Sequence, residues 1–110
     1  MVIAVDFDGT LMDPDHVLKG YKMGQPMPGA VLYMNKLHQA GHELIIFTAR
    51  NVNHPSAHKA VEDWLKFFQI PHNGITNIKQ PYFDVIIDNR CIAFMGSWSG
   101  ILSKIAKFDR

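Results

Sequence analysis

One stretch decides the fold: Val2-Ile-Ala-Val-Asp-Phe-Asp-Gly-Thr10, a short apolar run that leads directly into an acidic turn. Four consecutive apolar residues without alternation predict a strand that is buried on both faces, as in a parallel sheet. Parallel α/β sheets bind ligands at the carboxyl ends of their strands. Asp6 and Asp8 are therefore expected where a ligand would bind, with both carboxyl groups on one side of the chain as it leaves the strand.

Strands and helices alternate along the rest of the chain. Two further apolar runs predict buried strands, Glu43-Leu-Ile-Ile-Phe47 and Val85-Ile-Ile87. Weaker strand patterns cover 75–78 and 92–94. Helical spacing of apolar residues predicts helices from Pro28 to about Ala40, from near Pro55 to Pro71, and from near Ser97 or Ser99 to the end. This order predicts an α/β fold, a mainly parallel sheet with helices on both faces.

Length and composition restrict the protein to a few classes. The 110 residues carry 11 Lys and Arg against 10 Asp and Glu, so the net charge is +1. We expect one domain over residues 1–110, with an irregular flap at about 9–27. The near-neutral charge excludes strong nonspecific binding to nucleic acid.

The cysteine content and the lack of targeting patterns in the sequence predict a cytoplasmic protein. Cys91 is the only cysteine, so no intrachain disulfide can form, and we expect this side chain to be a buried apolar residue. We find neither a secretory signal pattern nor an apolar run long enough to cross a membrane.

Three more polar residues come at the ends of later predicted strands. Thr48 follows the 43–47 run, Lys79 follows 75–78, and Asp88 follows 85–87. Carboxylates at this edge can hold a metal ion, while a hydroxyl and an ammonium can hold phosphate oxygens. The combination favours phosphoryl transfer.

These motifs, in this order, resemble those of the haloacid dehalogenase superfamily over almost the whole chain. The resemblance rests on Asp-Phe-Asp-Gly-Thr, a strand-final Thr, a Lys and Ile-Ile-Asp-Asn. It implies a three-layer Rossmann-like core with a five-stranded sheet in the order 5-4-1-2-3. It also implies Mg²⁺-dependent chemistry through a phosphoaspartate.

The resemblance assigns a role to each matching residue. Asp6 would be the nucleophile, and Asp8 would protonate the leaving oxygen and later activate water. Thr48 and Lys79 would hold the transferring phosphoryl group. Asp6, the backbone carbonyl of Asp8, and Asp88 would bind magnesium.

Departures and neighbouring residues refine this hypothesis. The acid at Asp8 favours a phosphatase over a dehalogenase, whereas Asn89 stands where many members of the family have a second aspartate. The gaps after the first and third strands are too short for a cap domain, so the chain resembles the capless members. Arg50 could bind a substrate anion, because a guanidinium matches phosphate geometry.

Two other functions remain open from the sequence. The chain could be a phosphoacceptor or phosphate-binding module, or a non-catalytic relative with the same fold. As an enzyme it would take a small-molecule or polymer-end phosphate ester. The apolar residues of the flap also suggest a homo-oligomer with the flap at its interface.

Overall fold

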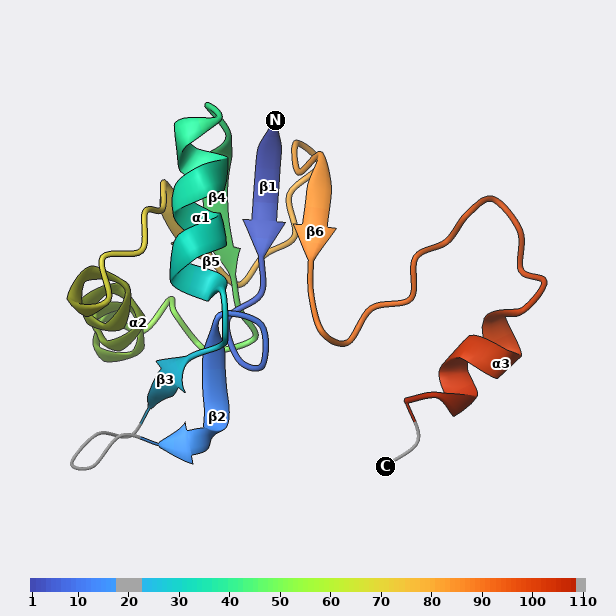
Figure 1. Cartoon of the computed structure of the whole chain (residues 1–110), viewed down its shortest axis with the longest axis horizontal. Helices are drawn as coiled ribbons and strands as arrows, with labels where there is room; N and C mark the ends of the chain where they lie inside the picture. The colour runs from blue at the N-terminus through green and yellow to red at the C-terminus, as the bar shows by residue number, and fades with distance from the viewer. Residues whose placement is uncertain (18–22, 109–110) are drawn as a thin grey trace.

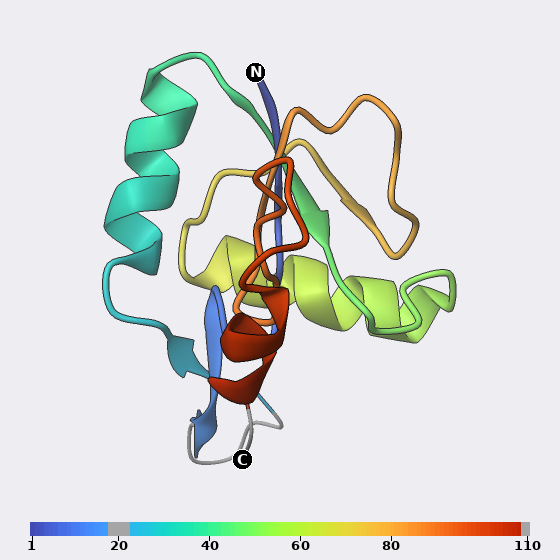
Figure 2. The same cartoon turned by 90° about the vertical axis from the view of Figure 1, so that its right-hand side faces the viewer.

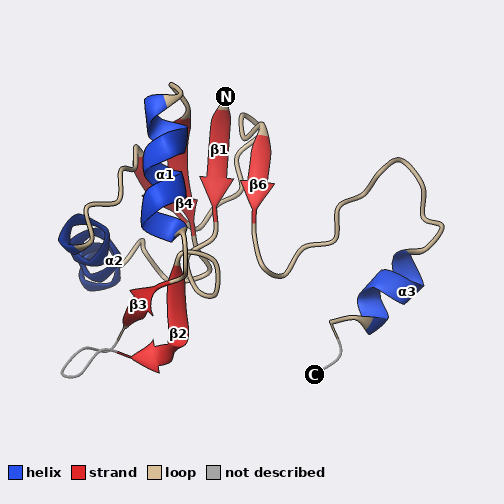
Figure 3. Ribbon diagram, viewed as in Figure 1, coloured by secondary structure: helices blue, strands red, loops and turns tan. Residues whose placement is uncertain are grey.

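The computed structural model describes residues 1–17 and 23–108, and Figure 1 shows a mixed α/β body from which the C-terminal segment extends. Figure 3 separates the helices from the strands. The strands are β1 (Val2–Val5), β2 (Met12–Val17), β3 (Gly24–Pro26), β4 (Glu43–Phe47), β5 (Gly74–Thr76) and β6 (Val85–Ile87). The helices are α1 (Ala30–Gln39), α2 (Pro55–Phe67) and α3 (Ile101–Ala106). No helix in the described ranges is both long and apolar enough to cross a membrane.

A parallel four-stranded sheet forms the centre of the body. Its order is β5-β4-β1-β6, with Ala4 of β1 opposite Ile45 of β4 and Ile86 of β6. Ala4 and Ile46 are completely buried. The strands predicted at 2–5, 43–47 and 85–87 are confirmed, and the one at 75–78 is shorter, at 74–76.

The predicted five-stranded order 5-4-1-2-3 is not matched. Residues 92–94 form no strand, so β6 is left at the edge of a four-stranded sheet. A three-residue apolar run specifies a strand only when a neighbouring strand pairs with it, and here the chain leaves the sheet directly after β6. The third helix begins at Ile101, later than expected, and stands away from the sheet in Figure 1.

The core lies between the sheet, α1 and α2. Figure 2 shows α1 along one face of the sheet. The core side chains come from β1, β4 and both helices and include Ile3, Val5, Met34, Leu44, Ile46, Val61, Trp64 and Leu65. The ring of Trp64 meets that of Phe7 edge to face at 5.0 Å. The apolar faces predicted for the first two helices are therefore confirmed in part: Met34, Val61, Trp64 and Leu65 are core residues, whereas Ala40 is exposed.

Local sequence signals explain where the two core helices begin and end. Gly41 takes a positive φ of 89° after α1, as expected of a glycine that stops a helix. Pro55 is the first residue of α2, and the His54 ring before it accepts a hydrogen bond from the Ser56 backbone N–H. Helix α2 ends at Phe67, four residues before Pro71.

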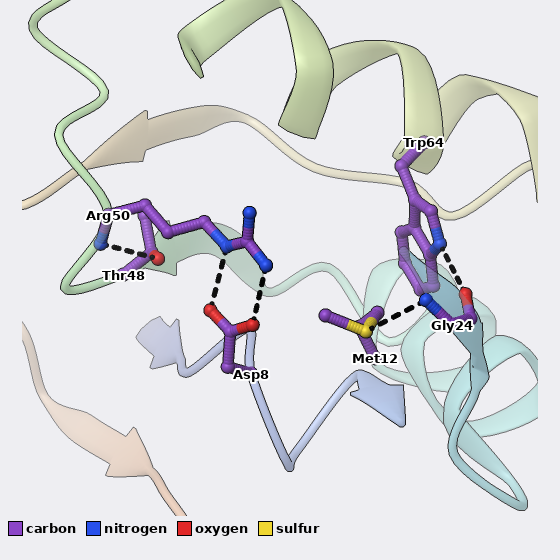
Figure 4. Close-up of polar contacts among 6 residues, drawn as sticks. All are labelled: Asp8, Met12, Gly24, Thr48, Arg50 and Trp64. Carbon is purple, nitrogen blue, oxygen red and sulfur yellow. Dashed lines mark hydrogen bonds and ion pairs between the residues drawn. The ribbon is translucent and has the colours of Figure 1, made fainter. Parts of the chain in front are cut away.

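The sequence predicted an irregular flap, but part of the flap forms regular structure. β2 and β3 pair antiparallel within it, and the indole Nε1 of Trp64 donates to the Gly24 carbonyl at 2.9 Å (Figure 4). Leu11, Met12 and Met23 are buried in the chain's own core. Two of the apolar residues expected to make the flap an interface, Leu11 and Met23, are thus buried internally, whereas Val17 is 56% exposed. Leu18 and Tyr21, two further apolar residues of the flap predicted at about 9–27, lie outside the described residues.

Residues 91–108, called the C-terminal arm below, differ from the body. None of residues 92–108 is buried. Cys91, expected to be buried, is exposed. The Cα radius of gyration, 14.9 Å, exceeds the roughly 13 Å expected of a compact chain of this length.

Candidate functional site

The predicted site residues follow the carboxyl ends of the parallel strands. Asp6 and Asp8 come directly after β1, Thr48 after β4, and Asp88 after β6. Lys79 follows β5 by three residues. Because β1 lies between β4 and β6, the first four side chains start from neighbouring strand ends.

A tight turn after β1 fixes the orientation of Asp6. The backbone N–H groups of Leu11 and Met12 both donate to the Phe7 carbonyl, at 3.0 and 2.9 Å. The turn brings the Thr10 hydroxyl within 3.0 Å of Asp6 Oδ2, to which it donates. One oxygen of the Asp6 carboxylate is therefore held by a residue of the same motif.

Gly9 allows this turn to pack against the turn after β6. Its φ is +86°, and a Cβ at this position would collide with the amide of Asn89. Only glycine satisfies both the backbone conformation and the close approach. The backbone N–H of Asn89 donates to the Thr10 hydroxyl at 3.1 Å, so Thr10 links the β1 turn to the β6 turn.

Thr10 is the site residue that the sequence-based assignment missed. The Asp-Phe-Asp-Gly-Thr motif contained the signal, but no role was assigned to its last residue. Asn89, in contrast, was singled out as a departure, and the structure shows it packed against the turn that carries the aspartates.

Asp8 is held by Arg50 rather than facing open solvent. Arg50 donates from Nε to Oδ2 at 2.8 Å and from Nη2 to Oδ1 at 2.7 Å, a bidentate pair shown in Figure 4. The guanidinium also lies over the Phe7 ring, 5.4 Å from its centre. Both side chains remain partly accessible, at 36% for Arg50 and 41% for Asp8, so an anion from solvent can compete for the guanidinium.

Thr48 supports Arg50 from a buried position. Only 2% of Thr48 is exposed, and its Oγ1 accepts the Arg50 backbone N–H at 3.1 Å. Its own backbone N–H donates to the Thr76 carbonyl. The hydroxyl hydrogen of Thr48 is left to donate elsewhere.

Burial and neighbouring charge both act on Asp6. Partial burial raises the pKa of the Asp6 carboxyl, and the negative charge of Asp88 raises it further. The hydrogen bond from Thr10 opposes this by favouring the ionised form. Asp6 and Asp88 are thus close enough to repel each other.

An acidic cleft of about 710 Å³ opens beside these residues. Its walls include five aspartates, Asp6, Asp8, Asp13, Asp15 and Asp88. Arg90 contributes a positive charge to the wall. Neither Thr48 nor Lys79 lines this cleft, and Lys79 is exposed. The structure therefore gathers the three predicted carboxylates on the cleft wall, whereas none of the three predicted phosphate-binding residues, Thr48, Arg50 and Lys79, lines the cleft.

Three flap side chains not assigned from the sequence, Asp13, Asp15 and His16, also border the cleft. On the flap, Asp13 Oδ2 lies within hydrogen-bond distance of His16 Nδ1, at 2.7 Å. The backbone N–H of Asp15 donates to Asp13 and lowers the pKa of the Asp13 carboxyl. No sequence pattern singled out these three residues, because the flap was expected to lack regular structure.

Cys91 lies close to the acidic residues. Although Cys91 is exposed, the loss of part of its hydration raises the pKa of its thiol, as do the charges of Asp88 and Asp6, whereas Lys79 lowers it. Within residues 1–17 and 23–108, no three His, Cys, Asp or Glu side chains are arranged so that they could hold a metal ion by themselves. A metal at this edge would need backbone or water oxygens as well as carboxylates.

Comparison with known proteins supports the fold but names no activity. No protein-family model matches the sequence, and no curated protein matches it. The chain is similar to the structure of a conserved protein from Bacteroides thetaiotaomicron, at a TM-score of 0.63 and 24% identity over 100% of this chain and 93% of that one. It is also similar to a structural-genomics target from Vibrio cholerae, at a TM-score of 0.57 and 25% identity over 84% and 83% of the two chains.

Proposed function

We propose that this protein is a Mg²⁺-dependent phosphatase that hydrolyses a phosphate monoester through a phosphoaspartate on Asp6. The observation that carries the proposal is the placement of Asp6, Asp8 and Asp88 on the wall of one cleft at the carboxyl edge of a parallel sheet. Such clustering is electrostatically unfavourable unless a cation or a substrate uses it. The sequence resemblance to haloacid dehalogenase-type phosphatases points to the same chemistry.

The residues present fit magnesium. Asp6 and Asp88 repel each other, and a cation between them would remove that repulsion. Together with the backbone carbonyl of Asp8 they offer only oxygen atoms, the ligands that Mg²⁺ prefers, with waters filling the other positions. When bound, magnesium would neutralise negative charge on the phosphoryl oxygens.

The reaction that we propose has two steps. An Asp6 carboxylate oxygen attacks phosphorus, the P–O ester bond breaks, and Asp8 gives a proton to the leaving oxygen. Asp8 then takes a proton from a water that attacks the phosphoaspartate, which releases inorganic phosphate and restores Asp6. The Thr10 hydrogen bond keeps Asp6 oriented through both steps.

Arg50 connects substrate binding to the acid–base role of Asp8. While it is paired with Arg50, Asp8 has both carboxylate oxygens occupied by guanidinium hydrogen bonds, so neither oxygen faces a leaving group. A phosphate group that takes over the Arg50 guanidinium would free Asp8 to carry a proton. The Thr48 hydroxyl and Lys79, neither of which lines the cleft, would reach the same phosphate only if the segments after β4 and β5 move towards it.

The decisive experiment measures hydrolysis of an aryl phosphate by the purified chain with magnesium and with excess chelator. We expect turnover with magnesium, loss with chelator, and recovery when magnesium is restored. Asp63→Asn serves as the matched control for Asp6→Asn, because Asp63 is an exposed aspartate on α2 that pairs with Lys59. Turnover that persists in Asp6→Asn would rule out the covalent mechanism.

The Asp8–Arg50 pair favours one alternative, a phosphoacceptor module. If Arg50 keeps hold of Asp8 after phosphoryl transfer, water is not activated and Asp6 stays phosphorylated. Incubation with a small phosphodonor followed by intact-mass measurement separates the two functions. A stable gain of one phosphoryl group without turnover indicates the module, whereas continuous phosphate release indicates the enzyme.

A further inference from the structure

The C-terminal arm exposes an apolar surface that a monomer in water does not favour. Met95, Trp98 and Leu102 are 81%, 77% and 85% exposed. Every residue of α3 is at least partly accessible, and α3 has no buried residue. A six-residue helix has little stability of its own and depends on packing of its apolar side. The arm therefore requires a surface to pack against.

The body offers a matching apolar surface. A groove of about 210 Å³ lies between the N-terminal part of α1 and the end of β6, and its walls include Val5, Leu11, Tyr33, Leu37 and Ile87. The open edge of β6 adjoins it, with Val85 and Ile87 both about 40% exposed. This face has the apolar character of the arm, and no described element covers it (Figure 1).

Local contacts direct the arm away from its own groove. The chain is fixed to the body at Asn89 through Thr10, and the Asp88 carboxylate then accepts the Arg90 backbone N–H at 2.8 Å in a tight turn. Farther along, the Phe94 and Trp98 rings pack at 5.3 Å, and Gly96 bends the chain with a φ of 88°. The hydrogen bonds of described residues 92–108 all stay within this segment.

We propose that the arm packs on the groove of a second copy of this chain, so that two copies exchange arms in a two-fold dimer. The apolar side of α3 would cover the groove beside α1, and the 92–94 run would lie beside the open edge of the partner's β6. Exchange uses one contact twice, by two-fold symmetry, and buries both exposed apolar surfaces. This inference concerns assembly and is independent of the proposed activity.

Light scattering over a concentration series tests the proposal on the full chain. We expect a mass near 25 kDa, twice the 12.5 kDa of one chain, that falls to 12.5 kDa in Leu102→Asp/Ile105→Asp. Lys104→Asp is the matched control, since it changes the net charge of α3 by the same two units without removing an apolar side chain. A wild-type monomer at all concentrations would overturn the proposal, as would a dimer that persists in the double variant.

A substitution in the groove provides a second, independent test. Tyr33→Asp should also give monomers, whereas Leu32→Asp should not, because Leu32 is a similarly exposed neighbour on α1 that does not line the groove. Circular dichroism confirms that each variant is folded. Equal behaviour of the two α1 variants would contradict the assignment of this groove.

Mixing the two kinds of monomer distinguishes exchange from an arm that folds back on its own chain. The Tyr33→Asp chain has an altered groove but an unaltered arm. The Leu102→Asp/Ile105→Asp chain has an altered arm but an unaltered groove. Arm exchange predicts that the mixture recovers one intact contact and forms heterodimers, detected by native mass spectrometry. If the mixture remains monomeric, the arm packs within its own chain or nowhere, and the proposal fails.

Discussion

The turn after β1 and the C-terminal arm after β6 begin from neighbouring strands but are stabilised in opposite ways. The turn contains Phe7, Leu11 and Met12, which are all buried in the chain's own core. The arm has seven large apolar residues from Phe94 to Phe108, more than the turn, yet six of them are exposed and Ile101 is only partly covered. Apolar composition alone therefore does not determine burial, because a side chain becomes buried only when the backbone brings it to a complementary surface.

The polar groups of the two regions differ in the same way. In the turn, Thr10 bonds to Asp6 and, across 79 residues of sequence, to Asn89. In the arm, the hydrogen bonds span two to four residues, such as Ser99 N–H to Ser97 and Lys104 N–H to Gly100. Long-range bonds hold the turn rigid for chemistry, whereas local bonds leave the arm free to meet another surface.

The largest expected effect, on turnover, comes from removing the negative charge of Asp6 in the turn after β1. Asp6→Asn keeps the shape of the side chain, so the fold survives, but an amide is a very poor nucleophile and turnover should fall by several orders of magnitude. Steady-state hydrolysis of an aryl phosphate measures it, with Asp63→Asn as the control. A loss of less than tenfold would remove Asp6 from the mechanism.

Stability should respond very differently to apolar truncation in the two regions. Leu65→Ala removes a completely buried side chain from the core and should lower the free energy of unfolding by about 2–5 kcal/mol. Leu102→Ala removes one that is 85% exposed. Leu102→Ala should lower the free energy of unfolding by less than about 0.5 kcal/mol. Urea unfolding measures both variants at a protein concentration low enough for the chain to be monomeric. Comparable losses in the two variants would show that the arm packs within its own chain.

Loss of the Thr10 hydroxyl should weaken the link between the β1 and β6 turns. Thr10→Val keeps the shape but removes the donor to Asp6 and the acceptor for Asn89, which should cost about 1 kcal/mol of stability. Turnover should fall more than stability suggests, since Asp6 loses its orientation. Thr76→Val, which removes only a local bond to Ile78, is the control.

Breaking the Asp8–Arg50 pair should affect binding more than stability. Both side chains are over a third exposed, so Arg50→Ala should change the free energy of unfolding by no more than about 1 kcal/mol. The KM for a phosphate ester should rise, because the anion loses its guanidinium partner. A KM equal to that of the wild type would remove Arg50 from the binding site.

The smallest effect concerns the pH dependence of Asp6. Because its pKa is raised in the folded state, its contribution to stability is full below the unfolded value, about 3.9, and is lost as pH rises through the higher folded value. At neutral pH in chelator, Asp6→Asn should therefore melt slightly above the wild type. Added magnesium should narrow or reverse this difference in melting temperature between Asp6→Asn and the wild type. A variant that melts below the wild type in chelator would contradict the raised pKa.

Local sequence patterns determined the parallel strands, the two core helices and the edge at which Asp6, Asp8 and Asp88 gather. Apolar runs without alternation, a proline at the start of α2 and Gly41 after α1 each act over a few residues, so they can be read without knowing the rest of the chain. The position of the acidic motif directly after β1 then places the cleft. The roles proposed for these residues came from their chemistry and their resemblance to a family, and they remain proposals.

Only the tertiary structure decided the partners of those residues. The bidentate pairing of Asp8 with Arg50, the bridge from Thr10 to Asn89 and the pairing of β2 with β3 join segments whose separation in space depends on the whole fold. The same holds for the run at 92–94 and for α3, whose patterns predict a strand and a helix but not a surface to pack on. Burial and pairing are properties of two surfaces together, and a sequence pattern specifies only one of them.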